Sequence, residues 1–280
     1  MTDFTEWVGR QRVEEDRLDL FPARGMNAVL DRDPLAFQEG SALPRCWHWL
    51  YFKPLVRRSD LSDDGHEKKG AFLPDVGLPR RMWAGGKLAF SGELKLGETV
   101  RRTSTIESVE EKAGRSGRLV FINLRHRVEG ERGLAVDETQ NLVYREGGVP
   151  AVGEGPAAPE SPAWSEPFAA DNVTLFRFSA LTFNGHRIHY DQPYSSREEG
   201  YPGVVVHGPL LALLLLDGAT RNGGRAPERF AYRAVSPLFA GEGFRLEGAG
   251  GLPRGAAGES EVWAVGPRGT AMRAMAGWDG

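Results

Sequence analysis

The sequence predicts an α+β protein of two domains, each built on an antiparallel sheet. Segments in which apolar and polar residues alternate recur on both sides of a proline-rich stretch. The order of segments in the first half is also weakly echoed in the second half, which indicates an internal repeat. A length of 280 residues is long for one ordinary domain and suitable for two.

The first half contains four stretches with the alternation expected of strands: KLAFSGEL, ETVRRTSTIESVEEK, GRLVFINLRHRVEGE and LAVDETQNLVYRE. Glycine turns such as RSG and ERG separate them. Residues 3–18 are interpreted as an amphipathic helix that carries Trp7 and Val13 among many charges. The bulky run 43–55 fits a strand or the wall of a pocket, and the polar residues 57–77 are expected to form a mobile loop.

A stretch rich in proline and small residues divides the chain. Residues 146–170 contain five prolines, more than a packed element tolerates. We therefore expect a first domain at 1–148, a linker at 149–170 and a second domain at 171–280.

The repeat can be aligned in two places. Residues 92–103 match 236–247, and residues 132–144 resemble 268–278. The first alignment pairs Leu94 with Leu238, Gly97 with Gly241 and Glu98 with Glu242. Two copies of one fold are the simplest explanation.

Composition excludes several function classes. The net charge of −3 gives no field suited to nucleic acid, and the apolar run Leu210–Leu216 is too short to cross a membrane. The single cysteine, Cys46, cannot form an internal disulfide, and no secretory leader pattern precedes Gly25, so a cytoplasmic protein is expected. No dinucleotide or P-loop fingerprint occurs, and no complete ligand set accompanies His186, His189 and Asp191. We predict neither a cofactor nor a metal.

The segment from Phe178 to Asp217 carries the chemistry. His189 is the best candidate base, because an imidazole can take and return a proton near neutrality. The amide of Asn184 could hold a water or a thioester carbonyl by hydrogen bonds. Either His186 or Asp191 could fix the tautomer of the base, and the spacing does not choose between them.

A glycine lies where the apolar helix of this segment should begin. Gly208 stands between His207 and Pro209, and proline favours the first turn of a helix. The amides at such an end are free and the helix dipole is positive there. The Gly208 amide could therefore stabilise negative charge on a carbonyl oxygen.

These residues resemble a known family. FSALTFNGHRIHYD followed by GYPGVVVHGPL is similar to the hydratase segment of MaoC-like hotdog proteins, in particular the type 2 hydroxyacyl-thioester dehydratases and mesaconyl-CoA hydratases. DGHEKKGAFLPDVGLPRRMWAGGKLAF and EKAGRSGRLVF resemble their non-catalytic partner domain. The resemblance implies a double hotdog, in which each curved antiparallel sheet wraps around a long helix. It places the family's histidine on His189 and its glycine on Gly208, its aspartate on Asn184 and its asparagine on His186.

The expected activity is reversible hydration of an α,β-unsaturated acyl thioester, carried by coenzyme A or by acyl carrier protein. His189 would take the water proton, Asn184 would position the water, and the Gly208 amide would hold the enolate oxygen. The expected substrate-binding residues are Arg80, Arg81 and Trp83 for coenzyme A, Arg187 for a charged acyl group, and His186 and His207. An acyl-CoA thioesterase and a non-catalytic acyl-thioester-binding subunit are the alternatives, and a homodimer is expected.

Overall fold

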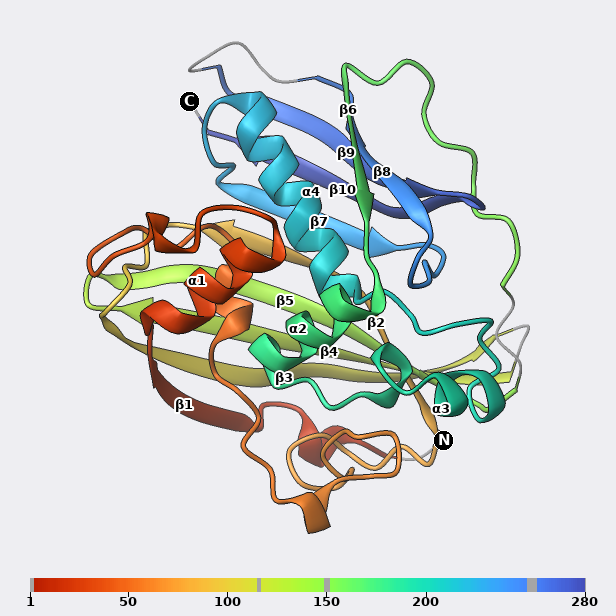
Figure 1. Cartoon of the computed structure of the whole chain (residues 1–280). Helices are drawn as coiled ribbons and strands as arrows, with labels where there is room; N and C mark the ends of the chain where they lie inside the picture. Colours follow the sequence, from red (N-terminus) through yellow and green to blue (C-terminus); the bar gives the residue numbers. More distant parts are fainter. Residues whose placement is uncertain (1–2, 115–116, 149–151, 251–255, 280) are drawn as a thin grey trace.

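One continuous antiparallel sheet organises the computed structural model of the chain (Figure 1). The structure describes residues 3–114, 117–148, 152–250 and 256–279. Across these residues ten strands pair in the order β1-β3-β4-β5-β2-β7-β10-β9-β8-β6. The sheet therefore consists of five strands from the first half of the chain followed by five from the second.

The elements have the following bounds. The strands are β1 Gln11–Arg17, β2 Arg80–Phe90, β3 Thr99–Gly114, β4 Gly117–Gly130, β5 Gly133–Arg145, β6 Trp164–Ala169, β7 Arg229–Ala234, β8 Gly243–Gly248, β9 Gly258–Gly266 and β10 Gly269–Trp278. The α-helices are α1 Leu20–Val29, α2 Asn172–Thr182, α3 Gln192–Arg197 and α4 Gly208–Gly223. Short 3-10 turns are η1 Thr5–Trp7, η2 Pro34–Ala36, η3 Trp47–Leu50, η4 Arg58–Asp60 and η5 Arg187–His189.

The predicted internal repeat is confirmed by the strand order. Read from its outer edge inward, the first half runs β1-β3-β4-β5-β2 and the second runs β6-β8-β9-β10-β7, which is the same order. The aligned turns also match in detail, because Gly97 and Gly241 both have positive φ, +97° and +80°. Next to these glycines, the Glu98 side chain accepts a hydrogen bond from the Lys95 backbone amide at 2.8 Å. In the same way, the Glu242 side chain accepts one from the Phe239 backbone amide at 2.9 Å. The fold is thus a double hotdog, as the resemblance implied.

The helices lie against the sheet and differ in length between the halves (Figure 1). Helix α4 crosses the strands of the second half, and its run Leu210–Leu216 is buried throughout, as predicted. The first half has instead the ten-residue α1, with α2 packed beside it so closely that a Cβ on Gly25 would meet Leu181 at 2.6 Å. The long helix expected in each half is therefore present only in the second. Among the described residues, no helix has the length and apolar composition needed to cross a membrane.

The two halves join where β2 pairs with β7. Gly85 and Gly86 lie at this join, opposite Arg233 and Tyr232. A Cβ on Gly85 would meet the Tyr232 carbonyl oxygen at 2.7 Å, and one on Gly86 would meet the Tyr232 hydroxyl at 2.4 Å. Both glycines are buried in the strand and permit the close approach of two backbones.

Two local predictions in the first half are wrong. Residues 3–18 are not a helix but the short turn η1 followed by edge strand β1, whose side chains alternate in exposure. Tertiary contacts override the weak helical pattern, since β1 pairs with β3 and Glu14 forms a 2.7 Å ion pair with Arg102. In the run 43–55 only the predicted strand is wrong, because the residues contain the 3-10 turn η3. The alternative, a pocket wall, agrees with the edge-on contact of Trp49 with Trp83 at 5.7 Å.

The predicted linker at 149–170 is too long. Strand β6 occupies its last part and forms the edge of the second sheet by pairing with β8. Pro167 does not prevent this, because a proline is tolerated on an edge strand, where one side of the backbone needs no partner. Residues 152–163 have no regular secondary structure; residues 149–151 of the linker and residues 115–116 of the RSG turn lie outside the described residues.

A buried carboxylate organises polar side chains inside the first half. Glu138 is 1% exposed and accepts hydrogen bonds from His48 Nε2 at 3.0 Å, Trp49 Nε1 at 3.0 Å and Gln140 Nε2 at 2.7 Å. Burial by itself would raise the pKa of Glu138, but these donors and the charge of nearby histidines lower it to about 2. The carboxylate is therefore ionised at neutral pH and holds η3 against the sheet.

Replacing this carboxylate should destabilise the fold. We expect Glu138→Gln to lower the unfolding free energy at pH 7 by about 3 kcal/mol. The glutamine side chain has an NH₂ group in place of one carboxylate oxygen, so some of the buried donors would lose their acceptor. The loss corresponds to a melting temperature lower by roughly 5–10 °C. Because the folded pKa of Glu138 is depressed, its stabilisation is present above about pH 4 and disappears as pH falls towards 2. The two melting curves should therefore converge in acid. Asp137→Asn, in an exposed pair with Arg125, is the control and should cost less than about 1 kcal/mol.

Candidate active site

The candidate base lies in the turn η5, after α2. His189 is buried, and its Nδ1 lies 2.7 Å from the carbonyl oxygen of Val205. Because a carbonyl oxygen can only accept, Nδ1 carries the proton and Nε2 keeps its lone pair. The tautomer is thus fixed by a backbone carbonyl, and neither of the two sequence candidates, His186 and Asp191, supplies that bond.

The environment keeps this imidazole neutral. Burial, with a smaller contribution from the charge of His66, lowers the pKa of His189 to about 4, although the hydrogen bond that Nδ1 donates to the Val205 carbonyl opposes the shift. An imidazole that is neutral at pH 7, with a free Nε2, can accept a proton from water.

His207 packs against the ring of His189. It is completely buried, its ring stacks on that of His189 with centroids 3.8 Å apart, and its Nε2 lies 2.8 Å from Ser179 Oγ on α2. Burial, followed by the charges of His189 and His186, places its pKa well below the ordinary value. His207 therefore packs against the candidate base.

Gly208 is the first residue of α4, as predicted, and follows His207 directly. The first amides of a helix have no partner within the helix, and the dipole makes this end positive. The ring of Trp83 covers the glycine, since a Cβ on Gly208 would lie 2.8 Å from it. Trp83 is itself stacked on Tyr232 at 4.4 Å and meets Trp49 edge-on at 5.7 Å. An aromatic wall from both halves therefore adjoins the free end of α4.

Asn184 forms a tight turn with the residues that follow it. Its Oδ1 accepts the backbone amide of His186 at 3.0 Å, and its own amide donates to the Ser179 carbonyl at 2.9 Å. The side-chain oxygen is therefore occupied, and the Nδ2 group remains to contact a ligand.

A second turn of the same kind comes from the first half, and sequence reasoning did not assign it to the site. In Asp64-Gly65-His66, Asp64 Oδ1 accepts the His66 amide at 3.0 Å, as Asn184 does for His186. The two turns pack against each other: a Cβ on Gly65 would meet the Gly185 oxygen at 1.9 Å, and one on Gly185 would meet the Gly65 oxygen at 2.9 Å. The Arg187 amide also donates to the Asp64 carbonyl at 2.9 Å. The signal was available in the repeated spacing of DGH and NGH.

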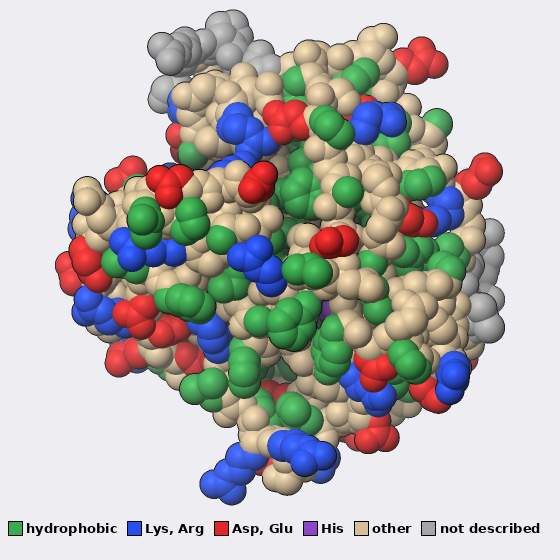
Figure 2. Space-filling model, in the orientation of Figure 1, with side chains coloured by type: hydrophobic (Ala, Val, Ile, Leu, Met, Phe, Trp, Pro, Cys, Tyr) green, Lys and Arg blue, Asp and Glu red, His purple; other side chains and the backbone are tan. Residues whose placement is uncertain are grey.

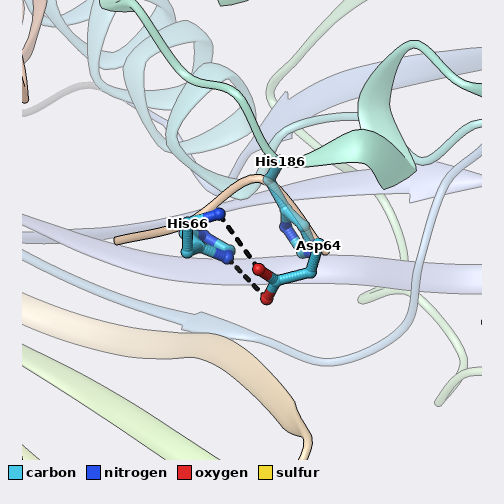
Figure 3. Close-up of side chains that lie close together, drawn as sticks. All are labelled: Asp64, His66 and His186. Carbon is cyan, nitrogen blue, oxygen red and sulfur yellow. Dashed lines mark hydrogen bonds and ion pairs between the residues drawn. The ribbon is translucent and has the colours of Figure 1, made fainter. Parts of the chain in front are cut away.

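Figure 3 shows the side chains that these turns bring together. The Oδ2 of Asp64 lies 2.9 Å from His66 Nδ1, and the ring of His66 lies 4.2 Å from that of His186. Burial opposes ionisation of Asp64, but the hydrogen bonds from His66 place its pKa below the ordinary value. Ligand atoms of these three residues lie within 4.8 Å of one another, a spacing that a metal ion would allow. However, both oxygens of Asp64 already bond His66, so the geometry is that of a hydrogen-bonded pair.

On the face shown in Figure 2, little histidine surface is visible. Hydrophobic side chains gather over the middle of the face, and only a small area of histidine is visible between them. Exposed apolar residues near the helices are Phe21 of α1 and Val173 and Phe176 of α2. The imidazoles are thus largely covered on this side.

The candidate arginines differ in their partners. Arg80 pairs with Glu199 at 2.9 Å, and Arg187 pairs with Asp191 at 2.7 Å and donates to the Asp63 carbonyl at 3.0 Å. Arg81 has no hydrogen bond or ion pair within the described part of the chain. It lies near enough to His66 and His186 for its charge to lower the pKa of both imidazoles, after burial as the main cause.

Comparisons with solved structures agree with the fold. A MaoC-like dehydratase aligns with a TM-score of 0.72 over 98% of both chains, at 13% identity. HtdX of Mycobacterium tuberculosis aligns with a TM-score of 0.66 over 95% of this chain and 98% of its own, at 17% identity. At such identities the likeness concerns the fold alone.

Sequence comparisons define the family. The description "hydroxyacyl-thioester dehydratase type 2" belongs to the family whose sequence model matches residues 46–240. Mesaconyl-C(4)-CoA hydratase of Chloroflexus aurantiacus is 42% identical over 87% of this chain and 88% of its own length. The mitochondrial hydroxyacyl-thioester dehydratase type 2 of Schizosaccharomyces pombe is 26% identical over 71% of this chain and 75% of its own.

A double hotdog whose sequence matches hydroxyacyl-thioester dehydratases and a mesaconyl-C(4)-CoA hydratase is a hydratase or dehydratase of the MaoC-like class. Within that class, the chain belongs to the hydroxyacyl-thioester dehydratase type 2 family. It is accordingly a hydro-lyase.

Proposed function

We propose that the protein adds water reversibly to an α,β-unsaturated acyl thioester of coenzyme A, with His189 as base and the Gly208 amide as oxyanion donor. The observation that carries the proposal is the free Nε2 of His189, oriented by Val205, close to the first amide of α4. Contact of His189 with His207, the residue before Gly208, brings the two groups together.

The chemistry follows from these positions. His189 Nε2 takes a proton from water as the water oxygen bonds to Cβ. The π electrons move towards the thioester and leave negative charge on its oxygen, which the Gly208 amide and the helix dipole stabilise. A proton then reaches Cα. The free Nδ2 of Asn184 donates a hydrogen bond to the attacking water or to the thioester carbonyl.

The first experiment distinguishes this reaction from the two alternatives. Purified protein is mixed with crotonyl-, longer enoyl- and mesaconyl-CoA while the enoyl-thioester absorbance and free thiol are followed together. Loss of absorbance without thiol release is the expected result. Thiol release would indicate a thioesterase, and tight acyl-CoA binding with neither signal would indicate a non-catalytic subunit.

We also propose that the acyl group carries a free carboxylate in addition to its thioester group, and that Arg81 binds this carboxylate. The Chloroflexus relative is named for mesaconyl-C(4)-CoA, a dicarboxylic acyl group. Arg187, the sequence candidate for this role, is committed to Asp191, and Arg80 is committed to Glu199. Arg81 lies two positions before Trp83 on β2, so both side chains leave the same face of the strand, the one that meets Gly208.

Replacing Arg81 should therefore change substrate preference. We expect Arg81→Gln to lower kcat/KM for mesaconyl-CoA by about 10–100-fold, because a charge-assisted hydrogen bond is worth roughly 1.5–3 kcal/mol. Hydration of crotonyl-CoA, whose acyl group has no free carboxylate, should change by less than about threefold, and Arg81→Lys should lose less than the glutamine variant. Equal losses on both substrates would assign Arg81 to the coenzyme A part, as the sequence first indicated.

We propose in addition that the protein is a cytoplasmic homodimer, the setting expected from its sequence. The thiol of Cys46 is free and buried in the structure, which suits a reducing compartment. The yeast relatives carry the word mitochondrial in their names. Symmetric dimers are the commonest assemblies of soluble proteins.

A further inference from the structure

We propose that His66, oriented by Asp64, is the second proton-transfer group of the active site and acts at Cα while His189 acts on water. This inference rests on the proposed hydration and assigns the step that His189 alone leaves open. It makes the first half of the chain a contributor of catalytic chemistry and not only a partner domain.

The position of His66 is the first argument. Its turn is locked against the turn of Asn184 and His186 by the reciprocal packing of Gly65 and Gly185. The ring of His186 contacts His66 at 4.2 Å and His189 at 5.4 Å, so all three imidazoles share one site. His66 is 24% exposed, which leaves it accessible to a ligand.

The hydrogen bonding of His66 is the second argument. The ionised carboxylate of Asp64 accepts from Nδ1 at 2.9 Å, which places the proton there and leaves Nε2 unprotonated. Nε2 has no hydrogen bond within the described residues. A carboxylate behind an imidazole fixes its tautomer and stabilises the imidazolium that forms when Nε2 takes a proton. Asp64 is thus a positioning residue for His66.

The protons balance if the two histidines share one. In dehydration, His66 Nε2 removes the Cα proton, the enolate collapses to the double bond, and protonated His189 gives its proton to the departing hydroxide. In hydration, the site first takes up one proton from solvent on His66 Nε2, where the Asp64 carboxylate stabilises the imidazolium; His189 then takes a proton from water, and protonated His66 gives its proton to Cα. Each turnover moves the shared proton from one imidazole to the other, and exchange through His186 or solvent restores the starting state.

The two turns provide well-matched variants. In His66→Asn, an amide nitrogen can replace Nδ1 as the donor to Asp64, while Nε2 is lost. In Asp64→Asn, the Oδ1 bond to the His66 amide can persist, since Asn184 makes the same bond in the sister turn. We expect kcat for crotonyl-CoA hydration to fall at least about 100-fold in His66→Asn and about 10–100-fold in Asp64→Asn, with KM nearly unchanged.

Hydrogen exchange between solvent and Cα distinguishes the role of His66 from that of His189. Butyryl-CoA has no double bond to hydrate, so deuterium uptake at its Cα from D₂O, read by mass spectrometry, reports the Cα base alone. Wild-type protein and His189→Asn should exchange, and His66→Asn should not. Exchange that persists in His66→Asn, or none in wild type, would overturn the assignment.

Two further outcomes bear on the proposal. Hydration by His66→Asn within threefold of wild type would overturn the role of His66 but leave the hydratase intact, whereas a wild type unable to hydrate any enoyl-CoA would sink the proposed function itself. A stoichiometric metal ion in the purified protein, with activity lost on chelation, would replace the proton-transfer role by a metal site.

Discussion

Replacing His189 by asparagine should lower kcat for enoyl-thioester hydration by about 10²–10⁴-fold, the usual contribution of one well-placed base. His189 has a structural role and a chemical role, and each role belongs to one of its two ring nitrogens. Nδ1 donates to the Val205 carbonyl at 2.7 Å, and Nε2 is the base. An asparagine amide can preserve the first contact and cannot perform the second.

The comparison of His189→Asn with His189→Ala tests that division. If the histidine acts as a base, both variants should be equally inactive, although the alanine variant should melt at a lower temperature because the buried carbonyl loses its donor. If the ring matters only for holding Val205, asparagine should restore most of the activity. Initial rates with crotonyl-CoA and thermal melting of the three proteins decide the matter.

The second half of the site was predictable because its residues are close in sequence. Asn184, His186 and His189 share one loop, and Gly208 follows a histidine at the start of an apolar helix. A helix beginning at a glycine followed by proline is a local pattern, so its free amide can be inferred without the fold.

The contribution of the first half was not predictable in the same way. Asp64 and His66 lie in a polar loop that sequence reasoning expected to be mobile, yet the loop is held against the second half by the Gly65–Gly185 packing. That contact joins residues about half a chain apart, so the shared spacing of DGH and NGH indicates two similar turns but not that they touch. Asp64 restores a carboxylate near the position where Asn184 stands in place of the family's aspartate.

The difference between local sequence patterns and contacts of distant residues also explains which parts of the fold could be predicted. The repeat was visible because its turns require a glycine at positive φ followed by a glutamate, in both copies. Strand β1 was missed because its charged side chains are stabilised by β3, which is distant in sequence. Edge strands with few apolar residues depend on such partners.

The Gly208 amide can be deleted at little cost to the fold, because residue 208 begins α4 and proline is favoured at that position. His207 has φ −62° and ψ 127°, the extended conformation that a following proline requires. Gly208→Pro therefore removes the N–H group, while Gly208→Ala keeps it. Both substitutions add a Cβ that meets Trp83 at 2.8 Å, so this contact is shared, whereas only proline places a ring carbon where the amide hydrogen was.

The difference between these two variants measures the loss of the amide donor together with its replacement by a ring carbon, and binding of a saturated thioester separates the two effects. We expect the alanine variant to lose activity because Trp83 must shift, and the proline variant to lose a further factor of about 10²–10³ in kcat, the usual effect of removing one oxyanion donor. The readouts are kcat and KM for crotonyl-CoA and the dissociation constant of butyryl-CoA. Because the amide acts on charge that develops during the reaction, binding of the saturated thioester should differ much less than kcat between the variants. Equal kcat values for the alanine and proline variants would show that the thioester oxygen is held elsewhere.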